Sequence, residues 1–187
     1  MDARRRVRSS KFLSLVLRHE PQRIGIVLDD AGWVAVDVLL DALALAGAPI
    51  ERAELEHIVA SSDKKRFALS KDGTLIRANQ GHSVEVDLGL SPATPPSPLF
   101  HGTIARFVSS IRERGLLRGE RHHVHLSHDV ETARRVAERR AAAIILSIDS
   151  ARMVADGHTF FRSDNDVWLI AHVPADYITF PGSPKSS

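Results

Sequence analysis

The stretch RFALSKDGTLIRA, residues 66–78, decides the fold of the first half of the chain. Two short, apolar-rich runs flank an Asp72-Gly73 pair, and Asp-Gly between such runs is typical of a tight β-hairpin. Three segments with helical signals precede this hairpin. Helices followed by a hairpin within about 80 residues favour a winged-helix module.

The first predicted helix carries its apolar residues in FLSLVL, residues 12–17. Ser9 or Ser10 can cap its N-terminus, and Pro21 stops it. The arginines in front of this helix are expected to form a solvated basic arm at the start of the chain: Arg4, Arg5, Arg6 and Arg8.

Two further helices are predicted between the first helix and the hairpin. Residues 25–36, GIVLDDAGWVAV, are expected to form a short strand, a turn and a second extended piece. Asp37 then caps a helix that Gly47 ends, and Glu51 opens another helix over residues 51–61.

The proline-rich stretch LGLSPATPPSP, residues 88–98, predicts a stiff linker between two lobes, residues 1–87 and residues 99–187. The second lobe contains short β-runs and two helices, one ending at Gly115 and one capped by Asp129. We therefore expect an α+β domain of mostly β character. It has neither GxGxxG after a strand nor GxxxxGK(S/T), so a Rossmann or P-loop nucleotide site is not expected.

The composition is that of a globular protein, with 43% hydrophobic and 26% charged residues among 187. The chain has no cysteine, which excludes disulfides, thiolate metal sites and cysteine nucleophiles. No signal peptide or membrane-spanning run is evident, so a cytoplasmic protein without membrane partners is expected. The net charge is only +2, so any anion site must come from local placement of cationic side chains.

The stretch RHHVHLS, residues 121–127, has an unusual density of histidine. On a strand, Arg121, His123, His125 and Ser127 would share one face. A metal site with His101 as a third ligand is one interpretation, although Arg121 would repel a dication. Hydrogen-bonded, half-buried histidines are another. Further basic clusters occur at residues 18–19, 64–66 and 76–83, and together they suggest a polyanion site built from several segments.

Eight motifs then carry a family resemblance that runs in order from about residue 10 to residue 178: SKFLSLVLRHEP, GWVAVDVLL, DKKRF, IRANQGHSVEVDL, FHGT, GLLRGERHHVHLS, DGHTFFRSDNDVWLI and VPADYI. In this combination the chain resembles the NAD-dependent RNA 2′-phosphotransferase family, whose members remove a splice-junction 2′-phosphate from tRNA. The resemblance covers nearly all of the chain except the tails and the linker.

This resemblance implies an N-terminal winged-helix lobe that binds RNA, a C-terminal ADP-ribosyltransferase-like lobe that binds NAD, and an active cleft between them. It also implies two chemical steps. The RNA 2′-phosphate attacks C1″ of the nicotinamide riboside and expels nicotinamide, which leaves RNA 2′-phospho-ADP-ribose. The ribose O2″ then attacks the phosphorus, which releases RNA with a free 2′-OH and ADP-ribose 1″,2″-cyclic phosphate. Neither step requires a metal, because an ionised phosphate is already a nucleophile.

The family's essential tetrad falls on Arg18, His19, Arg66 and Arg121. The three arginines are expected to bind the 2′-phosphate, because fixed guanidinium donors stabilise charge that moves onto phosphate oxygens. His19 is the candidate general acid for departure of the RNA 2′-oxygen, since the unperturbed pKa of histidine lies near neutrality.

The NAD side of the resemblance begins with the HGT motif. Its glycine is expected to allow close backbone approach to the nicotinamide amide, while its histidine bonds the adjoining ribose. His125 occupies a position where many relatives have tyrosine, and Val167 occupies the position of their catalytic glutamate; Trp168 is better explained as core. The full expected cofactor set is His101, Gly102, Thr103, His125, Ser127, Asp129, Asn165 and Val167. Expected RNA contacts are Lys65, Gln80 and His82, although a local structural role for the loop containing Gln80 and His82 is an equal alternative.

Three alternatives stay open. The enzyme could ADP-ribosylate terminal phosphates of nucleic acid, or it could be a metal-dependent hydrolase. It could also be a winged-helix regulator, but residues 51–61 carry more acidic than basic side chains, which argues against DNA readout by that helix. The substrate expected from the resemblance is a tRNA-like RNA with a 2′-phosphate, and no feature indicates an obligate protein partner.

Overall fold

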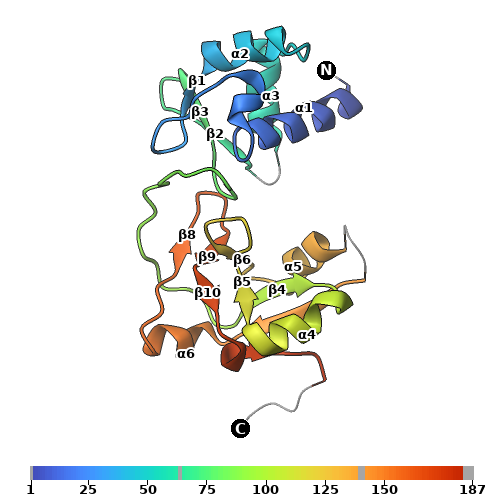
Figure 1. Cartoon of the computed structure of the whole chain (residues 1–187), viewed down its shortest axis with the longest axis vertical. Helices are drawn as coiled ribbons and strands as arrows, with labels where there is room; N and C mark the ends of the chain where they lie inside the picture. Colours follow the sequence, from blue (N-terminus) through green and yellow to red (C-terminus); the bar gives the residue numbers. More distant parts are fainter. Residues whose placement is uncertain (1, 63–64, 139–141, 183–187) are drawn as a thin grey trace. The chain divides into compact units, whose positions relative to one another are not determined.

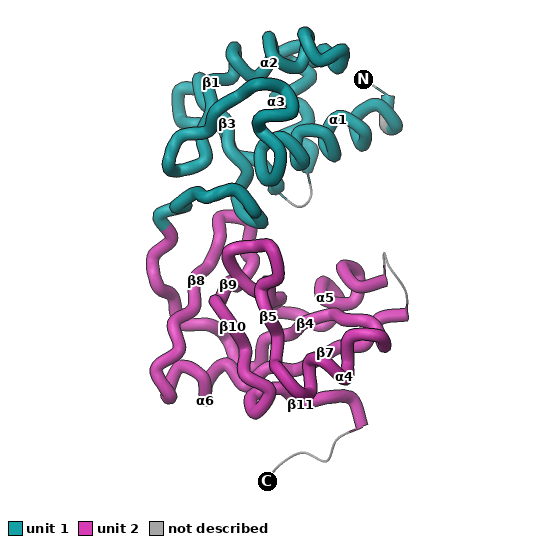
Figure 2. The backbone as a smooth tube through the Cα atoms, in the orientation of Figure 1, with its two compact units in different colours: residues 1–89 teal, residues 90–187 magenta. Residues whose placement is uncertain are grey.

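The chain folds as a mixed α/β protein with small antiparallel sheets and two compact units (Figures 1 and 2). The computed structural model describes residues 2–62, 65–138 and 142–182. Unit 1 comprises residues 1–89 and unit 2 residues 90–187. Within the described ranges, no helix is long and apolar enough to cross a membrane.

Unit 1 is a set of helices with one small sheet. Its elements are α1 (Ala3–Val16), the 3-10 helix η1 (Pro21–Ile24), β1 (Val34–Ala35), α2 (Val36–Leu45), α3 (Arg52–Ala60), β2 (Phe67–Leu69) and β3 (Leu75–Ala78). The antiparallel sheet has the order β1-β3-β2.

The predicted hairpin is confirmed as β2 and β3, with Ala68 opposite Arg77. Its turn is closed by Asp72, whose carboxylate accepts hydrogen bonds from Ser70 Oγ and from the backbone N–H of Thr74. These bonds, with the Ser70 hydroxyl as the largest cause, lower the pKa of Asp72 to about 2. Gly73 adopts a φ of +72°, a conformation that glycine reaches without strain.

The first helix begins earlier than the sequence predicts. Asp2 is its N-cap and accepts the backbone N–H of Arg5 at 2.8 Å, so α1 starts at Ala3 and not at Ser9. The expected solvated arm is therefore wrong, because its arginines lie in the first turns of α1. A carboxylate N-cap followed by arginines, which favour helix, explains the earlier start.

Residues 25–33 contain no strand, which corrects a second expectation. Asp29 Oδ1 accepts the backbone N–H groups of Ala31 and Trp33 at 3.0 and 2.8 Å, and this side-chain turn is the turn that the sequence predicts. The second extended piece is also confirmed, as β1, so only the first strand is wrong. Asp37 lies inside the first turn of α2 and does not cap it. In contrast, Glu51 caps α3 as predicted, in a reciprocal capping box with Glu54.

The core of unit 1 positions the segments that carry the predicted site arginines. Leu13, Val16 and Leu17 of the α1 segment are fully buried, and Phe67 of β2 and Ile76 of β3 pack in the same cluster. Buried Leu17 directly precedes Arg18, and buried Phe67 directly follows Arg66. Each arginine is therefore tied to an element end that the core holds in place.

Unit 2 is built from short antiparallel strands with helices packed on them. Its elements are β4 (Leu99–Thr103), α4 (Ala105–Arg114), β5 (Leu116–Leu117), β6 (Val124–Leu126), α5 (Val130–Ala137), β7 (Ile144–Ile148), α6 (Ser150–Ala155), β8 (Phe161–Arg162), β9 (Trp168–Ile170), β10 (His172–Val173), η2 (Ala175–Tyr177) and β11 (Ile178–Thr179). The sheets have the orders β11-β7-β4, β6-β9-β8 and β10-β5. Helix α5 packs on β4 and β7 (Figure 1).

Three details of unit 2 differ from the expectation. The sequence did not predict α6 or β5. Strand β6 begins only at Val124, so Arg121 lies in the preceding turn and not on the strand. Part of the proline-rich stretch is packed against unit 2, because Ala93 N donates to Phe160 O at 2.9 Å and Ser150 Oγ donates to Pro96 O at 2.7 Å.

Candidate active site

In unit 1, the backbone carbonyl of Arg66 organises the predicted cationic residues. It accepts a hydrogen bond from Arg18 Nη2 at 3.3 Å and another from the backbone N–H of Asn79 at 3.0 Å. The carbonyl of Arg18 in turn accepts the N–H of Ser83 at 2.9 Å. Three separate segments, the ends of α1 and β3 and the entry to β2, therefore meet at Arg18 and Arg66.

His19 lies beside this cluster, with its Nδ1 2.9 Å from Ser83 Oγ. A hydroxyl both donates and accepts, so the contact permits either neutral tautomer and the protonated ring. Ser83 thus orients the imidazole without fixing its protonation state. This freedom suits a group that has to give up and regain a proton.

The loop that presents Arg66 is held by a residue that the sequence analysis did not select. Asn79 is 6% exposed, and its Nδ2 donates to Lys65 O at 2.6 Å. Lys65 has a φ of +40°, a conformation that non-glycine residues rarely adopt, and its N–H donates to Ser62 O at 2.8 Å. Arg66 Nη1 also donates to Ser62 Oγ at 3.3 Å. The sequence does give one indication of this role, because Asn79 directly follows Ala78, the last residue of strand β3.

The residues after Asn79 shape the space around Arg18. Gly81 has a φ of +87°, and a Cβ there would lie 3.6 Å from Arg18 Nη1. The predicted RNA residue His82 is 2% exposed, and its Nε2 lies 3.4 Å from where a Cβ on Gly32 would sit. Gln80 is half-buried and Lys65 is exposed. The neighbouring basic residue Lys64 lies outside the described residues.

In unit 2, the HGT motif and the histidine stretch lie side by side. Phe100 and Ser127 exchange two backbone hydrogen bonds of 2.8 Å, which join β4 to the end of β6. His101 Nδ1 then lies 3.0 Å from the backbone oxygen of His125. A carbonyl only accepts, so His101 Nδ1 carries the hydrogen and its Nε2 is the acceptor in the neutral ring. Burial lowers the pKa of His101, and the nearby Arg121 lowers it further against the opposing effect of the His125 carbonyl.

Arg121 determines which nitrogen of the His125 ring carries the hydrogen, and the result is the opposite of that for His101. Its Nη1 lies 2.9 Å from His125 Nδ1. A guanidinium only donates, so His125 Nδ1 is the acceptor in this contact, and the ring hydrogen of neutral His125 is on Nε2. The two neighbouring imidazoles therefore offer different groups: an acceptor on His101 and a donor on His125. Although Arg121 is outside β6, the structure does bring it to His125, as the sequence analysis expected.

Close packing against α5 requires a glycine at position 102, which the sequence alone does not show. A Cβ at this position would overlap the backbone oxygen of Ala133 in α5 and come within 2.8 Å of Ala137 Cβ. The glycine is thus required for α5 to lie against β4. Thr103, the last residue of the motif, is 6% exposed.

The other expected cofactor residues have identifiable local roles. Asp129 caps α5 by accepting the Thr132 N–H at 2.7 Å, and this bond lowers the pKa of Asp129. Asn165 and Val167 lie in the turn between β8 and β9, where Ser163 Oγ is 2.7 Å from Asn165 Oδ1 and accepts the Val167 N–H at 3.2 Å. Trp168 is 6% exposed and packs in the core of unit 2.

Taken chemically, each unit offers one kind of contact. Unit 1 presents guanidinium donors and one imidazole, which suit a phosphoryl group. Unit 2 presents a donor and an acceptor on neighbouring rings next to Arg121, which suit a neutral amide or ribose hydroxyls. Among the described residues, no group of three or more His, Asp or Glu side chains could hold a metal ion. The predicted action of Arg121 together with Arg18 and Arg66 stays a prediction.

Comparisons with known proteins point in one direction. A family model described as RNA 2′-phosphotransferase, Tpt1/KptA family, matches residues 4–172. A probable RNA 2′-phosphotransferase of Streptomyces coelicolor is 52% identical over 181 residues, which cover 97% of this chain and 98% of that protein. Similar proteins of the same description occur in Trichormus variabilis, at 53% identity over 95% of this chain and 98% of that protein, and in Burkholderia pseudomallei, at 53% identity over 94% of this chain and 95% of that protein.

Proposed function

The chain belongs to the RNA 2′-phosphotransferase, Tpt1/KptA family, and from this premise we propose that it transfers an internal RNA 2′-phosphate to NAD. The products are RNA with a 2′-OH, nicotinamide and ADP-ribose 1″,2″-cyclic phosphate. In this proposal unit 1 is a winged-helix lobe that binds RNA, and unit 2 is an ADP-ribosyltransferase-like lobe that binds NAD.

The donor set of unit 2 fits NAD. When bound, NAD supplies the ribose carbon that the phosphate attacks, with nicotinamide as the leaving group. His101 offers Nε2 as an acceptor and His125 offers Nε2–H as a donor, a pair that matches ribose hydroxyls or a carboxamide. The lowered pKa of His101 keeps this ring neutral near pH 7, so the ring does not repel the positively charged nicotinamide ring. Gly102 supports this site indirectly. Its missing side chain allows α5 to pack on β4, the strand that carries His101.

The observation that carries the proposal is the cluster around the Arg66 carbonyl. The hydrogen bond from Arg18 to Arg66 O and the bond from Arg66 Nη1 to Ser62 limit the motion of both guanidinium groups before a phosphate binds. Donors that are already in place stabilise developing charge without reorganisation. Each typically lowers the activation barrier by about 3 kcal/mol. Arg121 is proposed as the third arginine that binds the phosphate.

His19 is proposed as the general acid that protonates the departing RNA 2′-oxygen in the second step. The Ser83 contact, at 2.9 Å, orients its ring. Expulsion of nicotinamide in the first step needs no proton from His19, because nicotinamide leaves as a neutral molecule from a cationic centre. The two steps should therefore respond differently to loss of this imidazole.

The direct test is to incubate the purified protein with NAD and an RNA that carries one internal 2′-phosphate. Loss of the phosphate should require NAD and should persist in excess chelator. A protein that removed the phosphate without NAD, or only with a metal, would rule the proposal out.

The His19→Ala variant tests the assigned role. It should release nicotinamide at a near-normal rate and accumulate RNA 2′-phospho-ADP-ribose. His57→Ala, which removes an exposed imidazole from α3, is the matched control and should complete both steps. Failure of His19→Ala to release nicotinamide would show that His19 acts in the first step.

A further inference from the structure

The charges of unit 1 are distributed very unevenly. Residues 1–89 contain thirteen Lys and Arg and thirteen Asp and Glu, so the unit is neutral as a whole. Helix α1 alone contains five of the cations and no acid, which leaves eight cations against thirteen acids elsewhere in the unit. A polyanion that approaches unit 1 is therefore attracted to α1 and repelled by much of the rest.

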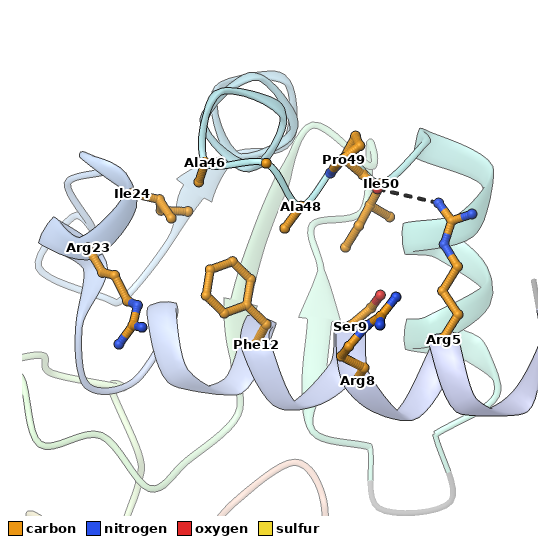
Figure 3. Close-up of a pocket in the computed structure, with 11 residues that line it drawn as sticks. Arg5, Arg8, Ser9, Phe12, Arg23, Ile24, Ala46, Ala48, Pro49 and Ile50 are labelled. Carbon is orange, nitrogen blue, oxygen red and sulfur yellow. Dashed lines mark hydrogen bonds between the residues drawn. The ribbon is translucent and has the colours of Figure 1, made fainter.

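A groove lies along this basic helix, between α1, η1 and the connection from α2 to α3. It has a volume of about 930 Å³. Figure 3 shows Arg5 at one end, Arg23 at the other and Phe12 between them, pointing towards Ala48. A second hollow of about 500 Å³ on α1 is lined by Arg4, Val7, Arg8 and Lys11, so Arg8 borders both.

Only part of this charge is neutralised within the protein. Arg5 pairs with Glu54 and Arg23 with Glu20, each at 2.9 Å. Within the part of the chain that the structure describes, Arg4, Arg8 and Lys11 have no carboxylate within ion-pair distance, and Arg8 interacts at longer range with the N-cap Asp2. The two hollows together therefore have three cations that no adjacent carboxylate pairs. Their apolar floor, which includes half-buried Phe12, can take the flat faces of sugars or bases.

Helix α3 follows α2 in the place that the recognition helix has in a DNA-binding helix-turn-helix. In this protein, however, α3 is poorly suited to bind nucleic acid. It carries Glu54 and Glu56 and follows the Glu51 cap, and its single arginine, Arg52, pairs with Glu56 at 3.2 Å and with Asp37 at 3.3 Å. Phosphates would be repelled from this face. The distribution of charge therefore favours the α1 groove as the RNA-binding surface. Analogy with helix-turn-helix proteins alone would have selected α3.

We propose that the α1 groove and the adjoining hollow on α1 together bind the backbone of the substrate RNA several nucleotides away from the 2′-phosphate. This inference rests on the proposed function. Arg8 lies eight residues before Val16, the last residue of α1, which is roughly 12 Å along the helix axis, and Arg18 follows two residues later. Taking the spacing of about 3.4 Å per nucleotide in one strand of duplex DNA as a guide, this distance spans roughly four nucleotides. The groove should therefore strengthen the binding of RNAs long enough to reach it, and it should leave the chemistry at the 2′-phosphate unchanged.

RNA fits this surface better than a lipid membrane. Membrane-surface helices present a broad apolar face that inserts between headgroups. Val7, 52% exposed, is the one strongly exposed large apolar side chain that α1 offers among the described residues. A concave surface bordered by Arg4, Arg8 and Lys11, the cations that the described carboxylates do not pair, matches a chain of separated phosphates.

The test compares the parent enzyme with Arg8→Glu/Lys11→Glu on two substrates. One is a trinucleotide with the 2′-phosphate on its central nucleotide, and the other is a tRNA-length RNA with the same central sequence. For the long RNA, KM should rise at least about tenfold with kcat unchanged, and the slope of log KM against log salt should fall by about two, one for each lost phosphate contact. For the trinucleotide, both constants should stay at the parent values. Lys71→Glu, an exposed charge reversal in the hairpin turn of the same unit, is the matched control and should behave as the parent.

Several results would overturn the inference. One is an equal KM change for both substrates, and another is a parent-like KM and salt slope with the long RNA. Loss of binding to anionic lipid vesicles in the variant, with RNA kinetics unchanged, would assign the groove to membranes instead. If charge reversal disturbs folding by circular dichroism, Arg8→Gln/Lys11→Gln should give the same pattern with a smaller KM change. A parent enzyme inactive on both RNAs would refute the proposed function itself, which is a distinguishable outcome.

Discussion

The two units hold their candidate site residues in different ways. In unit 1, Arg18 and Arg66 lie at the ends of elements, and one backbone carbonyl ties them together. In unit 2, His101 and His125 lie within paired strands, so strand register determines where their rings sit. In unit 1, hydrogen bonds to Arg66 O and to Ser62 limit the motion of the two guanidinium groups. Rings held within strands keep a defined donor and acceptor pattern.

Two glycines are required for different reasons. Gly81 in unit 1 has a φ of +87°, and a Cβ there would only make ordinary contact with Arg18 Nη1 at 3.6 Å, so its backbone conformation favours glycine. Gly102 in unit 2 makes room for the backbone of α5, so packing requires glycine there. A side chain at Gly81 should therefore strain the backbone, and one at Gly102 should push α5 away from β4.

The largest expected effect comes from removing a guanidinium. Arg66→Ala should lower the single-turnover rate of phosphate transfer by about 100-fold, because loss of one fixed donor costs about 3 kcal/mol of barrier. Arg121→Ala should cause a similar loss if the arginines of both units act on the phosphate. Arg106→Ala, which removes an exposed arginine of α4, is the control and should leave the rate unchanged. A parent-like rate for Arg121→Ala would confine phosphate chemistry to unit 1.

Gly102→Ala should reduce the stability of unit 2 and leave unit 1 intact. The new methyl group would overlap the Ala133 carbonyl, and overpacking of this kind costs about 1–3 kcal/mol. Urea unfolding of unit 2 can be followed by Trp168 fluorescence in a Trp33→Phe background, and unit 1 by Trp33 in a Trp168→Phe background. Gly119→Ala, which has open space but a φ of +64°, isolates the backbone cost of about 1 kcal/mol. A stability of Gly102→Ala equal to that of the parent would show that α5 moves aside at no cost.

Asn79→Asp should weaken the support of Arg66 in unit 1. The change keeps the shape of the side chain but removes the donor to Lys65 O, and an unsatisfied buried group costs about 1–3 kcal/mol. We expect a lower kcat with little change in KM for NAD, together with reduced unit 1 stability reported by Trp33. Gln22→Glu makes the same chemical change at an exposed position of η1 and should be neutral. An unchanged kcat would mean that the loop keeps Arg66 in place without Asn79.

The smallest effect is expected at the α5 cap. Asp129→Ala should destabilise unit 2 by about 1 kcal/mol at neutral pH. The Thr132 N–H lowers the folded-state pKa of Asp129, so the stabilisation is complete above the ordinary aspartate pKa and disappears as pH falls through the folded value. Trp168-monitored unfolding of the two proteins should therefore differ near pH 7 and converge at strongly acidic pH. A difference that persisted in acid would assign the effect to helix propensity and not to the carboxylate.

Local sequence signals were reliable where one short-range bond defines the feature. The Asp72-Gly73 turn, the Glu51 cap and the Asp129 cap all depend on partners within three residues, and the structure confirms them. The sequence offers serine and aspartate caps for α1, and the structure uses Asp2, two residues before the first arginine, in place of the predicted Ser9 or Ser10. Helix α6 was missed although it too has a local cap, Asp149.

By itself, the sequence determined the family of this protein, the identity of its candidate site residues and most of its local elements, because ordered motifs and short-range hydrogen bonds can be read along the chain. Only the tertiary structure decided which groups meet. The Arg18 bond to Arg66 O spans 48 positions and the His101 bond to His125 O spans 24. Tautomers, the supporting role of Asn79, the packing role of Gly102 and the basic α1 groove all arise from such contacts, which depend on how the cores place separate segments side by side.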